Sequence, residues 1–342
     1  MLELELLRQE KLTGMIQEFT PEDLIFKGSG ILPVENGSGE TVTWDIQRTP
    51  RNVLGFQGDH SPAKPQQLTG MGQRTAKLGK IFISKNIKAS LFNQLRQPGS
   101  DAVQKNASAQ IALEEKEFAA SMDRTEEFLV ASALQGEITT TVDDLEVDPI
   151  DYGIPAANKF TYNSGTPSLN IGDWLDVSTD IADAIRRFKK AARVATGKKI
   201  TRGWISDLVQ QALMKNERFI QIMRSTAEGV RALEEGSMGK FMGINWTVAD
   251  HVYKDAANAD VPYLPENVGV FSPEPSTDWG ALRYGSDLIP NNAGDGFTEA
   301  MGRYSYSEMQ KNPPGLTLYA GLRVFPIIKK PGALIHATVT AA

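Results

Sequence analysis

In this 342-residue chain, the 35 residues from Asp101 to Gln135 contain neither proline nor glycine, which predicts one long helix. Gly136 follows directly, at the position where many helices end in a left-handed residue. At 1.5 Å per residue, a helix of this length spans about 50 Å. Such a helix is longer than the core of an ordinary domain holds. We therefore expect it to cross the whole molecule as a spine.

One face of this expected helix is apolar and the opposite face is acidic. The apolar residues recur in steps of four and seven, which predicts one buried stripe. Its members are Val103, Ala107, Ile111, Phe118, Met122, Leu129 and Ala133. The acidic face carries Glu114, Glu115, Glu117, Asp123 and Glu126. A coiled coil is the alternative, although the apolar positions do not keep a heptad repeat over enough turns.

Residues 48–80 have a composition that does not fill a core, because apolar residues are sparse and glycines and prolines are frequent. A structureless loop of this length is uncommon in a compact domain. A two-stranded excursion fits better, and two arms of about 16 residues at about 3.3 Å per residue would reach about 50 Å. An isolated hairpin is marginally stable in water, so we expect another surface to hold it. A disordered surface loop is the alternative.

Charge is divided between this excursion and the segment that follows. Residues 48–100 hold nine Lys or Arg and one acid (net +8), whereas residues 114–151 hold twelve acids and two bases (net −10). Either the two segments pack together within one subunit, or the basic segment lies on the acidic segment of a neighbour. The candidate basic contacts are Arg48, Arg51, Lys64, Arg74, Lys77 and Lys80. The candidate acidic contacts are Glu114, Glu115, Glu117, Asp123, Glu126, Asp143, Asp144, Glu146 and Asp148.

The second half of the chain mixes helices and strands, which makes the expected fold class α+β. A helix is expected from Trp174 to Thr196, with Ser178 or Thr179 as its cap and Gly197 at its end. The basic residues between 186 and 202 are typical of a solvated helix end, with a surface facing nucleic acid as the alternative. Two strands, 316–328 and 333–340, are expected to close the chain.

The sequence carries few signs of catalytic or metal chemistry. It has no cysteine, which excludes disulfides, thiolate metal sites and cysteine nucleophiles. Its three histidines lack the spacing of metal ligands on a helix. Asp144, Glu146 and Asp148 alternate as in a calcium loop, but Pro149 stands where that loop requires glycine. We therefore expect no cofactor, no metal and no enzymatic activity. A soluble acidic enzyme or binding protein is the alternative from a different class.

The N-terminal residues and the distribution of apolar residues indicate where the protein is made. Glu3 and Glu5 stand where a secretory signal has positive charge and then an apolar run. The sequence also lacks an apolar stretch of about 18 residues or more, the length of a membrane span. We expect synthesis in the cytoplasm and no membrane partner.

The order of these segments resembles the major capsid proteins of tailed bacteriophages with the Hong Kong 97-type fold, in the lambda-like branch. The resemblance covers nearly the whole chain and lies in segment order and length more than in any single motif. The stretches that carry it, besides the tail from Leu316, are TVTWDI at 41–46, PRNVLGF at 50–56, EEFLVASALQG at 126–136, LPEN at 264–267 and LRYG at 282–285.

This resemblance implies a division of the chain into named parts. Residues 1–47 would be the N-arm and residues 48–85 the E-loop. Residues 86–170 and 316–342 would form the peripheral domain, with the spine helix at about 101–136. Residues 171–315 would form the axial domain, and the loop 291–296 is a candidate for its tip.

The resemblance also implies a function. The chain would be a major capsid (head) protein that self-assembles, as hexamers and pentamers, into the icosahedral shell around the double-stranded DNA of a tailed phage. The basic E-loop would lie on the acidic peripheral domain of the neighbouring subunit. Implied partners are a scaffold, a portal, a decoration protein and the packaged DNA, bound non-specifically. The expected location is the virion, after assembly in the host cytoplasm. An encapsulin-like compartment of the same fold is the structural alternative.

Overall fold

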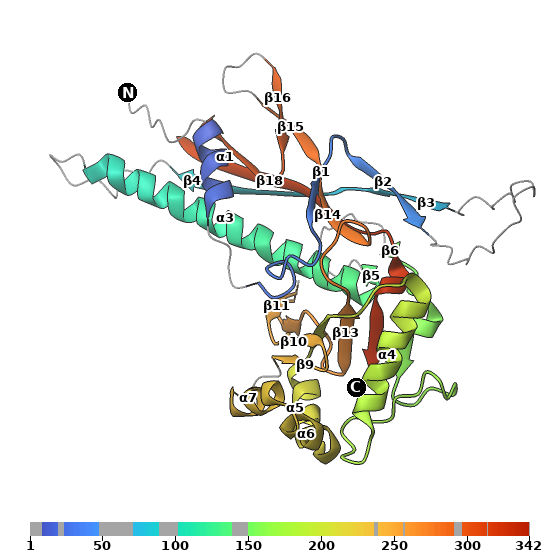
Figure 1. The fold of residues 1–342 in the computed structure, drawn as a ribbon. Coiled ribbons are helices and arrows are strands. Elements are labelled where there is room, and N and C mark those ends of the chain that lie inside the picture. Colours follow the sequence, from blue (N-terminus) through green and yellow to red (C-terminus); the bar gives the residue numbers. More distant parts are fainter. Residues whose placement is uncertain are drawn as a thin grey trace, which may run out of the picture.

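The fold is described here from a computed structural model of the full chain. The structure describes residues 9–19, 24–47, 71–88, 102–138, 150–235, 239–255, 257–290, 296–312 and 314–341. These residues form two lobes, one above the other in Figure 1. Helix α3 (Ala102–Gln135) runs obliquely through the upper lobe, and its C-terminal end reaches the junction of the two. The expected spine helix is confirmed, with 34 residues.

The upper lobe, which we call the spine lobe, places α3 against one face of a five-stranded sheet. The sheet order is β1 (Val34–Asn36), β14 (Gly280–Tyr284), β18 (Pro314–Ile328) and β17 (Tyr304–Lys311), and β4 (Gly79–Lys88) also pairs with β18. Strand β18 is buried at nearly every residue from Leu316 to Ile328, as expected for a central strand covered by a helix on one face and paired on both edges. Helix α1 (Gln9–Glu18) packs beside α3 and β17 and buries Leu12 and Ile16.

A hairpin projects from this lobe. Strands β2 (Thr41–Gln47) and β3 (Met71–Lys77) pair antiparallel, from Thr41 opposite Lys77 to Gln47 opposite Met71. Strand β3 continues through Leu78 into β4, so the hairpin extends the main sheet outward (Figure 1). The expected two-stranded excursion is thus confirmed at its root. Its first strand begins at Thr41, before the expected boundary at residue 48.

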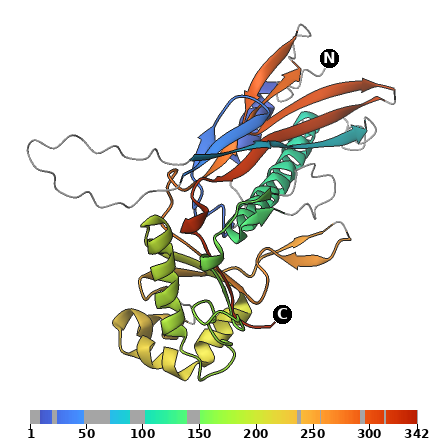
Figure 2. The same cartoon turned by 90° about the vertical axis from the view of Figure 1, so that its right-hand side faces the viewer.

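The lower lobe, which we call the second lobe, contains a six-stranded sheet and four helices. The sheet order is β7 (Lys159–Thr161), β19 (Ile335–Thr338), β13 (Val268–Ser272), β8 (Arg202–Ile205), β10 (Ile244–Val248) and β9 (Lys240–Phe241). The helices are α4 (Ile181–Thr196), α5 (Asp207–Lys215), α6 (Glu217–Arg224) and α7 (Ala227–Glu235). Figure 2 shows them gathered at the end of the molecule opposite the spine-lobe sheet.

Helix α4 differs from the prediction at its N-terminal end and agrees with it at its C-terminal end. It begins at Ile181, and its N-cap is Asp180, whose side chain accepts from the Asp183 amide, so the expected Ser178 or Thr179 cap is wrong. Asp176 already accepts the Ser178 amide and hydroxyl in the preceding turn. Gly197 ends the helix as expected, with a φ of 79°.

Small elements complete the chain. These are β5 (Glu137–Ile138) with β6 (Ile150–Asp151), β11 (Val252–Lys254) with β12 (Asp260–Pro262), β15 (Ser286–Pro290) with β16 (Phe297–Met301), and the 3₁₀ turns η2 (Ala156–Asn158) and η3 (Pro331–Ala333). The β15–β16 hairpin stands at the outer end of the spine lobe (Figure 1).

The topology divides the chain differently from the expected domains. Strands β14 and β17 pair with β18 in the spine-lobe sheet, although their residues fall within the expected axial range of 171–315. The expected axial tip at 291–296 falls between β15 and β16 in the sequence, and these two strands pair with each other. Residues 291–295 themselves lie outside the described part of the chain.

The turn that follows the N-terminal helix makes two contacts with the second lobe. Phe26 of the spine lobe stacks on Trp204 of β8, with ring centroids 5.8 Å apart. The Arg202 guanidinium donates to the Ser29 carbonyl at 3.0 Å. The turn that carries Phe26 and Ser29 therefore contacts both lobes.

Candidate functional site

Glu127 on α3 holds the turn that follows the N-terminal helix. Its two carboxylate oxygens accept from the backbone amides of Ile25, Phe26 and Lys27 at 2.8, 2.7 and 2.7 Å. Burial raises the pKa of Glu127, and the three amide donors oppose that rise. One side chain near the end of the spine helix thus ties down three successive residues of the N-terminal segment.

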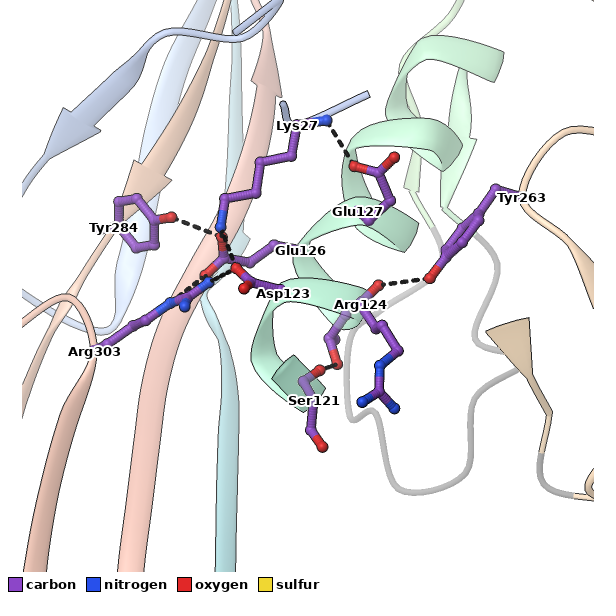
Figure 3. Close-up of polar contacts among 10 residues, drawn as sticks. Lys27, Ser121, Asp123, Arg124, Glu126, Glu127, Tyr263, Tyr284 and Arg303 are labelled. Carbon is purple, nitrogen blue, oxygen red and sulfur yellow. Dashed lines mark hydrogen bonds and ion pairs between the residues drawn. The ribbon is translucent and has the colours of Figure 1, made fainter. Parts of the chain in front are cut away.

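A charged cluster lies one turn away on the same helix (Figure 3). The Lys27 ammonium lies 2.7 Å from Asp123 and 2.5 Å from Glu126. Arg303, just before β17, reaches Asp123 and also lies 3.0 Å from Glu126. The Tyr284 hydroxyl of β14 donates to Glu126 at 2.9 Å. Two cations face two carboxylates, so formal charge is balanced within the cluster.

Burial makes this cluster sensitive to the loss of any member. Asp123 and Glu126 are 2% and 0% exposed, so removing one cation leaves carboxylate charge in an apolar setting. Burial alone lowers the pKa of Arg303, but Glu126 and Asp123 raise it more, so the guanidinium stays charged. Burial and the neighbouring Glu126 raise the pKa of Tyr284, which keeps its hydroxyl a donor. The cluster joins the N-terminal turn, the spine helix and the sheet.

A second cluster lies where the projecting hairpin meets the sheet. Asp287 of β15 lies 2.6 Å from Lys80 of β4 and 3.4 Å from Arg323 of β18. The Tyr304 hydroxyl donates to Asp287 at 2.5 Å. Arg323 also pairs with Glu40, just before β2, at 2.9 Å. Both strands at the hairpin root are therefore fixed to the body by ion pairs.

The structure assigns several of the predicted acidic contacts to the interior of the subunit. Asp123 and Glu126 pair with Lys27 and Arg303, and Glu115 is 0% exposed and bonds to Ser305 at 2.7 Å. For these three the expectation of an exposed contact with a neighbour is wrong. All three acids in the C-terminal half of α3, Asp123, Glu126 and Glu127, are buried, so this half of the helix has no free acidic face.

The remaining predicted residues are divided between paired, exposed and undescribed positions. Glu114 and the exposed Glu117 both bind Lys85 of β4, while Lys80 binds Asp287. Arg74 donates to the Asp151 carbonyl, and Lys77 is exposed at the end of β3. The other predicted residues lie outside the described part of the chain: Arg48, Arg51, Lys64, Asp143, Asp144, Glu146 and Asp148.

Sequence reasoning missed the groups that complete both clusters. Lys27, Arg303, Asp287 and Arg323 lie far along the chain from their partners, and none belongs to a recognisable motif. One signal was available on the helix itself. Glu115, Met122 and Glu126 follow Ile111 and Phe118 at spacings of four or eight, which places both acids on the buried stripe.

Metal sites, membrane-spanning helices and pockets are further features to consider in the described residues. Among them, no group of three or more His, Asp or Glu residues is placed to hold a metal ion. No described helix is long and apolar enough to cross a membrane. A groove of 340 Å³ lies beside the Lys27–Asp123–Arg303 cluster, between Phe19, Val34 and Met301, but the charged groups at its edge are already paired with each other.

The two lobes, the spine helix and the projecting hairpin define a class of protein. A putative capsid protein of a prophage from E. coli CFT073 superposes with a TM-score of 0.63 at 14% identity, covering 95% of each chain. The mature capsid of bacteriophage PhiM1 gives a TM-score of 0.55 at 10% identity, covering 95% of this chain and 89% of the other. The capsid of cyanophage P-SCSP1u gives 0.54 at 11% identity, covering 95% and 90%. The fold is that of Hong Kong 97-type phage capsid subunits.

The family follows from the sequence itself. The model of the phage major capsid protein E family matches residues 9–339, and the chain belongs to that family. It is a shell-forming major capsid protein, and membership in a structural family implies a structural role in the virion capsid. Comparison with curated proteins found no match.

Proposed function

We propose that copies of this chain close into an icosahedral shell around double-stranded DNA, with the β2–β3 hairpin of each subunit reaching onto the next. The observation that carries the proposal is the hairpin itself. Its two strands are anchored to the body through Lys80, Asp287, Arg323 and Glu40, and 23 residues (48–70) separate the paired strands. An anchored hairpin of this length is suited to a contact outside its own subunit.

Some of the charged residues predicted for this contact are already buried or paired within the subunit, so we exclude them from it. Glu115, Asp123 and Glu126 serve the subunit interior, and Lys80 belongs to the hairpin anchor. Glu114 and Glu117 are paired with Lys85, and Arg74 donates to the Asp151 carbonyl, so we leave these three out as well. On the basic side we assign the contact to Arg48, Arg51, Lys64 and Lys77. On the acidic side we assign it to Asp143, Asp144, Glu146 and Asp148. Each exposed pair contributes about 0–1 kcal/mol, and the sum is repeated around every closed ring.

The proposed capsid function also implies further partners and a place of assembly. A scaffold, a portal and a decoration protein complete the particle, and assembly takes place in the host cytoplasm without enzymatic activity of this chain. The peripheral domain corresponds to the spine lobe and the axial domain to the second lobe. The net charge of −6 favours a shell wall that binds packaged DNA weakly, since non-specific DNA binding requires a basic surface.

A charge swap tests the contact between subunits. The hairpin variant R48E/R51E/K64E is expected to assemble poorly, as measured by the sedimenting fraction at low salt. The swap that adds D143K/D144K/E146K to the same chain is expected to restore assembly, because attraction between copies returns with opposite signs. The matched control R186E on α4 should assemble normally. Assembly of the hairpin variant at wild-type levels would contradict the proposed contact.

A further inference from the structure

Ser305 of β17 lies where the N-terminal helix, the spine helix and the sheet meet. The Thr13 hydroxyl of α1 donates to the Ser305 carbonyl at 3.0 Å and accepts from the Ser305 amide at 3.2 Å. Both backbone groups of this residue are thus bound by one side chain of α1. The Ser305 side chain is buried and contacts α3 and β18 instead of α1.

The Ser305 hydroxyl has one proton and two acceptors. Its oxygen lies 2.7 Å from Glu115 Oε1 on α3 and 2.9 Å from the Tyr319 carbonyl on β18. A hydroxyl donates only one hydrogen bond. Both distances are satisfied together when Glu115 is protonated, because the carboxyl then donates to Ser305 and Ser305 donates to Tyr319. An ionised Glu115 would compete with the Tyr319 carbonyl for that single proton.

The surroundings favour the neutral form of Glu115. The residue is 0% exposed, and its second oxygen, Oε2, has no hydrogen-bond partner among the described residues. Burial raises the pKa of Glu115 to about 7, although the Ser305 hydrogen bond offsets part of that rise. An unprotonated carboxylate here would be a buried charge with one shared donor.

The charged groups of the elements around Glu115 are engaged elsewhere or face solvent. On α3, Glu114 and Glu117 bind Lys85 of β4, and Lys116 is exposed. Arg303, which precedes β17, is bound to Asp123 and Glu126. On β18, Arg323 is paired with Asp287. The other charged residues of α1 and β17 are exposed: Glu10, Lys11, Glu18, Glu308 and Lys311. Among the described residues, Glu115 forms no ion pair.

We propose that Glu115 is a proton-controlled latch between the spine helix and the N-terminal helix. With its proton, the chain Glu115–Ser305–Tyr319 closes, and Thr13 holds α1 to the far side of the same serine. When Glu115 loses its proton, the buried charge weakens the hydrogen bonds of the Ser305 hydroxyl. Helix α1 and strand β17 are then held less tightly to α3. The latch is internal to one subunit, so it stands independently of the proposed contact between subunits.

The test compares the full-length chain with E115Q by urea unfolding between pH 5.5 and 8. Glutamine has the shape of protonated glutamic acid and donates to Ser305 at every pH. Linkage between a folded pKa of about 7 and an unfolded value of about 4.3 predicts that the unfolding constant of the parent protein rises more than about tenfold over this range. In E115Q that rise should be lost, whereas E117Q, on the exposed part of the same helix, should keep it.

A local readout distinguishes the latch from general destabilisation. The chain has no cysteine, so E10C on the exposed face of α1 accepts a single spin label. The label should become more mobile as pH rises through about 7 in the parent background and stay unchanged in E115Q. Equal mobility changes in both backgrounds would assign the pH response to groups other than Glu115 and would overturn the proposal.

Infrared spectroscopy keeps the proposal testable if E115Q does not fold. The folded parent protein should show a protonated carboxyl band at pH 6 that disappears by about pH 8.5, because this carboxyl titrates near neutrality. If no carboxyl titrates between these limits in the folded state, Glu115 does not carry the proton and the latch is wrong.

Discussion

The two lobes are stabilised in different ways. The second lobe has an aromatic core in which Phe188 contacts Phe160, Trp174 and Phe271, with ring centroids 4.7, 6.3 and 5.2 Å apart. The spine lobe has an apolar core too, but its N-terminal turn, helix and sheet are joined by buried charges. The stability of the second lobe should therefore depend mainly on side-chain packing. The stability of the spine lobe should also depend on pH and on the charges of its buried residues.

The largest effect should come from the packing of the second lobe. Phe188→Ala removes a fully buried ring with three aromatic neighbours, and large-to-small changes of this kind cost about 3–5 kcal/mol. The loss should be nearly the same from pH 5.5 to 8, as measured by urea unfolding. Phe82→Ala, at a ring that is 45% exposed, is the matched control and should cost much less. Equal losses at the two sites would contradict the packing account.

A comparable but more condition-dependent loss is expected in the spine lobe. Arg303→Met leaves Asp123 and Glu126 with Lys27 as their only cation in the cluster, and breaking a buried ion pair costs about 3 kcal/mol. Arg186→Met, on the exposed surface of α4, should leave stability nearly unchanged. If R303M and R186M behaved alike in thermal unfolding, the buried cluster would not hold the lobe together.

Acid should weaken the hairpin root. Burial alone raises the pKa of Asp287, but Lys80 and Tyr304 lower it more, so its folded pKa lies below the ordinary value. Its contribution is therefore fully present above the unfolded pKa of about 3.9 and is lost as pH falls through the lower folded value. Asp287→Asn should cost about 1–2 kcal/mol at neutral pH and flatten the acid limb of the stability curve. An unchanged acid limb would remove Asp287 from the anchor.

The smallest effect should come from the cap of α4. Asp180→Ala removes the side chain that accepts the Asp183 amide and should cost about 1 kcal/mol. Ser178→Ala, at the position expected from sequence to cap the helix, should cost less, because the Ser178 hydroxyl is bound to Asp176 and Asp180 is the N-cap. Thermal unfolding of the two variants decides which residue is the cap.

Local patterns explain what could be predicted from the sequence. The spine helix from residue 102 to 135, the Gly197 end of α4 and the terminal strand over 314–328 all follow from periodicity and from glycine or proline at their ends. The order of these elements was also enough to indicate the fold. Each depends on residues that are near neighbours in the chain.

Long-range pairing explains what could not be predicted. Asp123 and Glu126 looked like part of an exposed acidic face, because their partners Lys27 and Arg303 lie 96 to 180 residues away. The pairing of β14 with β18, which moves residues 280–284 into the spine lobe, leaves no local mark either. Charge counts locate acidic and basic segments, but only the fold shows which of those charges are already neutralised inside the subunit.

The most direct test of the whole account is electron microscopy of the purified full-length chain, with sedimentation at low and high salt. We predict closed shells, or rings of five and six subunits, that loosen as salt rises because exposed charge pairs are screened over about 8 Å at physiological ionic strength. Shells that resist salt would keep the capsid assignment and remove the charge contact. A compact monomer at every concentration, with and without a scaffold, would contradict the account.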